Sequence, residues 1–230
     1  RYYVAATYNT ENGNLKVDRL NNFNNNIKLH KIQLRSNVNI NVTKTTELNI
    51  RMSGSFDDYK GPLYGGTEIY NMAMAANPVL FPKTYEPDEA NKFANHILFG
   101  NYGDGNYLNP YAEMVKGYKD YSKTIIIAQA ELKQKLDFIT KGLSARVLGS
   151  TTRNSYFDLQ RYYNPYYFQL TSFDDRTGLY KLVNINPETG TKYLNYSEGG
   201  KTISSNFYLE SAIGYNRNFA DKHDISGILV

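Results

Sequence analysis

The 230-residue chain has no cysteine and no tryptophan. Without cysteine it forms no disulfide, carries no thiol nucleophile and binds no metal through sulfur. Long apolar runs are also missing: residues 125–128 form one of the longest, far below the ~18 residues that a membrane helix needs. The sequence thus excludes a disulfide scaffold, a thiol enzyme and a helical membrane span.

The chain has little net charge. Its 26 basic and 22 acidic residues leave a formal charge of +4, and they are scattered along the sequence. Proteins that bind nucleic acid gather basic side chains into runs or patches that follow the phosphates. We therefore expect no nucleic-acid partner.

Residues suited to catalysis or metal binding are sparse. His30, His96 and His223 lie far apart in sequence, so they lack the close spacing of zinc ligands. The Asn- and Gly-rich segment 101–106 offers oxygen atoms to a calcium ion but has no closing glutamate of the EF-hand type. Calcium binding and an ordinary glycine-rich turn both stay open for that segment. We expect no enzyme activity, no cofactor and no metal centre.

What the sequence does contain is a long alternation of apolar and polar residues. Between residues 32 and 42, the even positions read Ile, Leu, Ser, Val, Ile, Val, and the odd positions between them read Gln, Arg, Asn, Asn, Asn. Residues 47–56 repeat the pattern. Successive side chains of a strand point to opposite faces, so the pattern predicts strands with one apolar and one polar face.

The same reading along the chain gives a regular order of strands and links. We predict strands at residues 1–9, 31–43, 47–57, 122–136, 143–157, 203–217 and 223–230. Short turns alternate with long segments at residues 10–30, 58–121 and 158–202. Within these long segments we predict a short helix over 67–78 and a small hairpin over 178–196 that turns at 186–190.

An antiparallel meander with every long connection at one end is the layout of an outer-membrane barrel. In hydrocarbon every backbone polar group must be paired, so a sheet spans a membrane only as a closed barrel. We therefore expect an all-β fold: a transmembrane antiparallel β-barrel segment with long extracellular loops. The expected lumen residues are Arg35, Asn37, Asn39, Arg51, Glu131 and Lys133.

Seven strands are too few to close a barrel with so polar an interior. Both ends of the chain also read as the inside of a strand. We therefore expect residues 1–230 to be one partial barrel domain, an internal segment of a larger protein, with any plug domain outside this chain.

Tyrosine is unusually frequent, with 22 residues. Tyrosines that flank strands are typical of the aromatic girdles of membrane barrels. Others lie in the long segments among Asn, Gly and Asp, a mixture suited to stacking on sugar rings or contacting peptide backbone. Packing of the loops on each other is the equal alternative. The candidate substrate-binding residues are Tyr59, Tyr64, Tyr102, Tyr107, Tyr162, Tyr163, Tyr166 and Tyr167.

Four segments together resemble one protein family. They are YYVAATYNTENG, LRSNVNINVTKTTELNIRMSGS, KGLSARVLGS and YNRNFADKHDI. In this order they are similar to successive strand and turn segments of the SusC/RagA family of TonB-dependent outer-membrane transporters from Bacteroidota. The resemblance covers nearly the whole chain outside the loops.

The resemblance implies a 22-stranded barrel with an N-terminal plug in the bacterial outer membrane. It implies a SusD-like surface lipoprotein as partner, energy supplied through TonB, and import of oligosaccharides or oligopeptides. The plug and the TonB box are absent from this chain. The alternatives are a passive porin or adhesin barrel, and a secreted β-sandwich carbohydrate-binding module whose apolar strand faces meet a second sheet.

Overall fold

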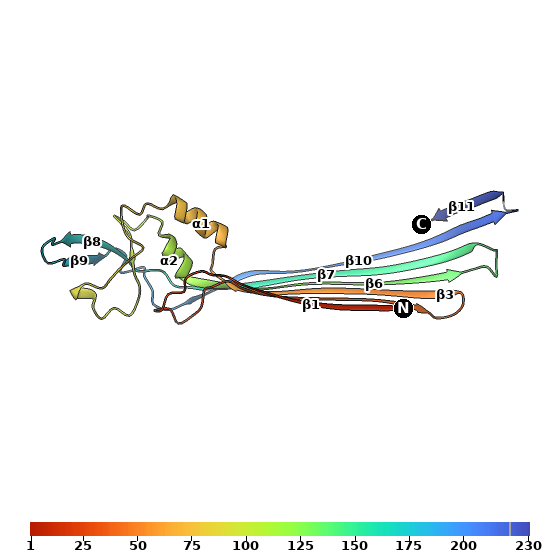
Figure 1. Ribbon diagram of the computed structural model, residues 1–230, viewed down its shortest axis with the longest axis horizontal. Coiled ribbons are helices and arrows are strands. Elements are labelled where there is room, and N and C mark those ends of the chain that lie inside the picture. The colour runs from red at the N-terminus through yellow and green to blue at the C-terminus, as the bar shows by residue number, and fades with distance from the viewer. Residues whose placement is uncertain (221) are drawn as a thin grey trace.

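The protein is all-β. The computed structural model describes residues 1–220 and 222–230, with 55% of the chain in strands and 8% in helices. Figure 1 shows two parts: long strands form a sheet at one end, and the helices and short strands form a smaller unit at the other. We call these the long sheet and the loop unit.

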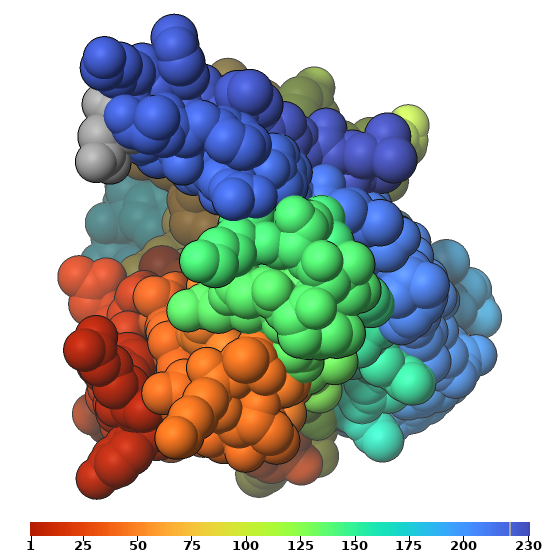
Figure 2. All heavy atoms as spheres, turned by 90° about the vertical axis from the view of Figure 1, so that its right-hand side faces the viewer, coloured from red at the N-terminus to blue at the C-terminus, as the bar shows by residue number. Residues whose placement is uncertain are grey.

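The long sheet has seven strands in the order β1-β2-β3-β6-β7-β10-β11, each antiparallel to its neighbours. The strands are β1 (Tyr2–Asn12), β2 (Lys28–Asn41), β3 (Thr46–Gly61), β6 (Gly117–Lys135), β7 (Leu143–Tyr162), β10 (Asn195–Phe219) and β11 (His223–Leu229). Seen along the strands in Figure 2, the colours pass from red through orange and green to blue. The predicted antiparallel sheet is therefore confirmed.

Several strands extend farther toward the loop unit than the sequence pattern predicts. β6 has 19 residues, β7 has 20 and β10 has 25, so the long connections shrink to residues 13–27, 62–116 and 163–194. The cause is the backbone ladder. Hydrogen bonding between neighbouring strands continues where the side chains no longer alternate.

The register sorts the side chains into a polar and an apolar face. Cross-strand partners share a face because side chains alternate along each strand. In mid-sheet the aligned positions form these rows: Asn37, Arg51 and Gln129 on the polar face; Val38, Ile50 and Ala130 on the apolar face. The alternation predicted from the sequence is thus kept across neighbouring strands.

The apolar face of the long sheet is uncovered. Met52 is 52% exposed, Leu209 64% and Phe207 74%. Figure 1 places the helices and the second sheet beyond the ends of the long strands, so within the described residues no layer packs on this face. A sheet in water normally buries such a face against another element.

The loop unit contains the second sheet, three short helices and its own core. Its four strands lie in the order β4-β5-β8-β9. They are β4 (Thr84–Tyr85), β5 (Leu98–Gly100), β8 (Tyr167–Phe173) and β9 (Tyr180–Asn184); the helices are α1 (Gly66–Ala75), α2 (Pro110–Val115) and the 3₁₀ helix η1 (Glu89–Asn91). Phe99 and Phe168 are the largest fully buried side chains. Hydrophobic burial therefore holds the long connections together as one packed unit.

Among the described residues, no helix has the length and apolar character needed to cross a membrane.

The small hairpin predicted over residues 178–196 is wrong. β9 pairs with the preceding strand β8, and the turn lies at residues 174–179, with Gly178 at φ +69°. Residues from Asn195 onward instead extend β10 along β7. The turn predicted at 186–190 is present, closed by hydrogen bonds from the Thr189 and Gly190 N–H groups to the Asn186 carbonyl, but it lies between β9 and β10 and does not close a hairpin. The Asn186 side chain accepts a hydrogen bond from the Tyr167 N–H at 2.7 Å.

The predicted helix over 67–78 is present with different ends. It starts at Gly66 after Gly65 as N-cap, and the Glu68 carboxylate accepts a hydrogen bond from the Gly65 N–H at 2.6 Å. It ends at Ala75, and the N–H of Ala76 still bonds to the Met72 carbonyl. The carboxylate that reaches back to the cap sets the start one residue earlier than Thr67.

Asn109 offers a test of how the loop unit is held together. It is 1% exposed; its amide donates to the carbonyls of Lys83 and Gly100 at 2.8 Å each and caps α2 by accepting from the Tyr111 and Ala112 N–H groups. Asn109→Ala should destabilise the loop unit by about 3 kcal/mol, since it removes two hydrogen bonds to backbone carbonyls and a helix cap. Native-state hydrogen exchange of residues 98–116 measures this loss.

Asn14→Ala is the matched control, because Asn14 is exposed and makes none of the described side-chain hydrogen bonds. Equal protection in the two variants would contradict the structural role of Asn109.

Candidate functional site

The six polar residues proposed from the sequence lie on one face of the long sheet. Asn37 is paired with Arg51 and Asn39 with Asn49, and the next strand places Glu131 opposite Asn49. Arg35 and Lys133 fall on the same face by register, opposite Ser53 and Glu47. Arg35, Asn39, Arg51 and Lys133 are exposed, Asn37 is half-buried, and Glu131 is buried.

Glu131 is the centre of a charge network near the turn end of the polar face. It is 5% exposed. Lys133 Nζ lies 3.3 Å from its Oε2, and Arg146 Nη1 lies 3.5 Å from its Oε1. Asn49 donates its amide to Oε2 at 3.2 Å. A buried carboxylate needs such partners, because an unpaired charge costs several kcal/mol away from water.

The network extends to residues that the sequence reading did not select. Arg146 also pairs with Glu210, so three neighbouring strands, β6, β7 and β10, are joined through side chains as well as through their backbones. Asn49 was missed in the same way. The signal was present, since the alternation within each strand puts all three on the polar face, but only the register shows which strands lie side by side.

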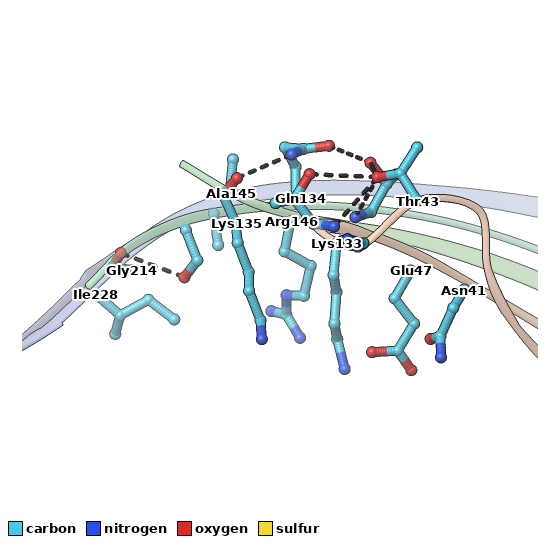
Figure 3. Close-up of a pocket in the computed structure, with 15 residues that line it drawn as sticks. Asn41, Thr43, Glu47, Lys133, Gln134, Lys135, Ala145, Arg146, Gly214 and Ile228 are labelled. Atoms are coloured by element: carbon cyan, nitrogen blue, oxygen red, sulfur yellow. Dashed lines mark hydrogen bonds between the residues drawn. The ribbon is translucent and has the colours of Figure 1, made fainter. Parts of the chain in front are cut away.

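A broad hollow adjoins this network. Its volume is about 830 Å³, and it lies at the turn end of the long sheet. In Figure 3 the side chains of Lys133, Arg146 and Glu47 extend from the strands to the same side, the inside of the sheet's curve. Basic residues from three segments line it: Lys44, Lys133, Lys135 and Arg146. The polar face is thus concave, and charged side chains fill much of it.

Most of the candidate tyrosines pack within the protein. Tyr163 and Tyr167 lie against the core cluster around Phe99, and Tyr166 against the cluster around Phe168. Burial raises the pKa of Tyr167 to about 12 and also raises the pKa of Tyr163. For these three, the structure agrees with packing of the loops on each other.

Three further candidates are half-buried. Tyr59 stacks on Tyr121, with ring centres 4.6 Å apart. The ammonium of Lys116 lies 5.7 Å from the ring centre of Tyr64. Tyr162 ends β7. These rings contribute to packing at the junction between the long sheet and the loop unit.

Only Tyr102 and Tyr107 among the eight candidates are exposed, at 44% and 47%. Their rings approach edge to face with centres 6.2 Å apart. Of the eight candidates, these two are the most accessible to a ligand.

The segment that carries this pair is held by Asn101. Asn101 is fully buried, and its Oδ1 accepts from the N–H groups of Tyr102 and Tyr107 at 2.8 and 3.3 Å. Gly103 and Gly105 have φ of +60° and +77°, which residues with a side chain rarely adopt. The Asn101 side-chain oxygen is thus engaged by backbone N–H groups rather than offered to a calcium ion, which favours the glycine-rich turn. Over the described residues, no group of three or more His, Asp or Glu could hold a metal ion.

The chain was compared with known proteins. No protein-family model matches it, and no curated protein matches it. The features that bear on its function are the two faces of the long sheet, the charge network and the loop unit.

Substitution of Arg146 tests whether the charge network around Glu131 stabilises the protein. Arg146→Met removes partners from Glu131 and Glu210 and should lower the free energy of unfolding by about 1–3 kcal/mol, the range for a charged hydrogen bond. Denaturant titration in detergent measures it. Arg51→Met is the control, since Arg51 is exposed and belongs to none of the described ion pairs.

If the network matters, adding Glu131→Gln to Arg146→Met should cost less than the sum of the two single substitutions. An Arg146→Met loss no larger than that of Arg51→Met would show that the network adds nothing to stability.

The loop tyrosines predict an alkaline transition. A pKa raised from 10 to about 12 for Tyr167 means that the folded state keeps a proton that the unfolded chain loses. This contribution is complete below pH 10 and is lost as the pH rises toward 12. Hydrogen exchange of residues 163–168 should therefore accelerate over this range, and less so in Tyr167→Phe. An unchanged alkaline response in Tyr167→Phe would contradict this account.

Proposed function

We propose that this chain forms part of the wall of a transmembrane β-barrel. The uncovered apolar face carries the proposal: Leu34, Met52 and Leu209 are between 48% and 64% exposed on strands that a second layer does not cover. Lipid is the partner that fits a continuous apolar sheet face of this kind. The polar face, with Arg51 and the network around Glu131, would then line a water-filled interior.

The arrangement of connections supports the same proposal. The turns at residues 42–45 and 136–142 are short and lie at one end, whereas residues 62–116 and 163–194 are long and lie at the other. Membrane barrels keep short turns on the periplasmic side and long loops outside the cell. In this orientation the loop unit stands above the outer leaflet. Further strands, from outside this chain, would pair with the edges β1 and β11.

Within this class we propose a SusC/RagA-like TonB-dependent importer of the outer membrane. The four resembling segments lie on strands and turns of the long sheet. In KGL, Gly142 has φ +85°, and a Cβ there would lie 2.1 Å from the Asn216 carbonyl oxygen. Glycine is thus required in this turn, which gives one of the motifs a physical basis.

The proposed activity is import of oligosaccharides or oligopeptides with a SusD-like lipoprotein, energised through TonB by parts outside this chain. The chain contributes wall and loops rather than catalysis. Tyr102 and Tyr107 are the proposed substrate contacts, because their rings are exposed on the loop unit.

The rival β-sandwich module requires a second sheet against the apolar face of the first. The four-stranded sheet here belongs to the loop unit, at the far end of the long strands (Figure 1). This position favours the barrel wall. A passive porin shares the wall, and dependence of uptake on TonB separates it from the importer.

Two adjacent residues on opposite faces test the proposal. Leu34→Arg places a charge on the apolar face of β2, and Gln33→Arg places it on the polar face. If lipid covers the apolar face, Leu34→Arg should cost about 2 kcal/mol in lipid vesicles, while Gln33→Arg should cost well under 1 kcal/mol. Reversible denaturant titration of the full-length protein in vesicles measures both.

Equal costs at the two positions would contradict a lipid-facing β2. Loss of uptake in a strain without TonB then tests the importer separately, because a passive barrel would keep its uptake.

A further inference from the structure

Three outer segments meet at His96. The small hollow beside it, about 60 Å³, is lined by residues 20–21, 95–97, 163, 166 and 191–192, so each of the three long connections contributes. Hydrogen bonds tie the same segments together. Tyr163 donates its hydroxyl to the Asn21 side chain at 3.2 Å, and the Asn21 amide donates to the Val115 carbonyl at 2.7 Å.

The His96 ring is packed rather than hydrogen-bonded. Its centre lies 4.7 Å from that of Tyr166 and 6.0 Å from that of Phe168. Tyr166 in turn packs on Gly190, where a Cβ would lie 2.2 Å from the ring. The ring contact between His96 and Tyr166 thus joins two of the long connections. The close approach of Tyr166 leaves no room for a residue larger than glycine at position 190.

Both ring nitrogens of His96 are buried, and neither has a hydrogen-bond partner among the described residues. A neutral imidazole leaves one N–H donor and one acceptor unpaired but carries no charge. A charged imidazolium would carry two buried N–H donors and a positive charge without an acceptor, which costs far more. The packed junction therefore favours the neutral form of His96.

The charged surroundings of His96 also favour its neutral form. Among the residues that line the hollow, Lys192 is the charged one. The other lining residues, which come from all three connections, are Leu, Ile, Asn, Thr and Tyr. Tyr163 stays protonated near neutral pH because burial raises its pKa. Burial, and then the charge of Lys192, lower the pKa of His96 below 6.5.

We propose that His96 is a pH-sensitive switch for the loop unit: its neutral ring closes the junction of the three outer connections, and a proton on the ring opens it. The inference goes beyond the proposed transport function and does not depend on it, since the junction has the same contacts whether or not the long sheet spans a membrane.

The direction of the pH dependence follows from linkage. Above pH 6.5 the ring is neutral in both the closed and the open junction, and the pH has no effect. Below that value the open form binds a proton that the closed form excludes. The ratio of open to closed junction should then rise by up to about tenfold per pH unit, until the closed form also takes the proton.

Hydrogen exchange of the full-length protein between pH 7.5 and 5 tests this, with labelling times scaled to the intrinsic exchange rate at each pH. Peptides covering residues 95–101 and 163–168 should lose protection below about pH 6.5, relative to peptides from residues 124–132 of the long sheet. Constant relative protection over this range would overturn the proposal.

Variants make the test specific to His96. His96→Gln and His96→Phe, two neutral replacements that differ in their packing, should each abolish the acid-induced loss. Lys192→Met should reduce it, because removal of the nearby charge raises the pKa of the closed form. His30→Gln, which alters the histidine bonded to Tyr8, should leave it unchanged.

A full acid response in both His96 variants would overturn the proposal. If the Leu34→Arg test shows that the long sheet does not lie in lipid, an acid-induced loss of protection that still depends on His96 would support the switch all the same.

Discussion

The structure depends on one constraint: a seven-stranded sheet presents an apolar face that its own chain does not cover. Leu34 and Phe207 would each lose much of their hydrophobic free energy if this face stayed in water. Among the described residues, the backbone satisfies its hydrogen bonds within the sheet except along two outer edges: β1 on one side, and on the other β11 together with the part of β10 before Ile213 that β11 does not reach. The proposed closed barrel in lipid would supply both an apolar surround and paired edges.

The polar features follow from the same geometry. The sheet curves so that charged side chains gather on its inner side (Figure 3), and Glu131 is buried there although the sheet is open. Lys133 and Arg146 keep that carboxylate paired. In the loop unit, buried asparagines have the corresponding role: the side-chain amides of Asn101 and Asn109 donate hydrogen bonds to backbone carbonyls of this unit. Ion pairs thus link side chains on the concave face of the long sheet, and amide hydrogen bonds hold the loop unit together.

The sequence predicted the strands better than the loops, for a physical reason. Period-two alternation is local, so the strand containing Leu34 and Arg35 can be read without knowing its neighbours. The burial of Tyr163 and Tyr167 against Phe99 and the bond from Asn49 to Glu131 depend on segments far apart in the chain. Asparagine adds to the difficulty, because the same residue marks an exposed turn or, as Asn101, fills a core. Tyr102 and Tyr107 were selected with six tyrosines that prove half-buried, since composition alone does not report exposure.

The most direct test of this account is whether the full-length protein is held in a membrane by lipid. Membranes would be washed with alkaline carbonate and then extracted with detergent, and the protein followed in each fraction. The account predicts that it stays with the membrane through the wash and is released only by detergent, because lipid covers the face that bears Leu34, Met52 and Leu209. Release by carbonate, or recovery as a soluble protein without detergent, would contradict it and require a protein layer on that face instead.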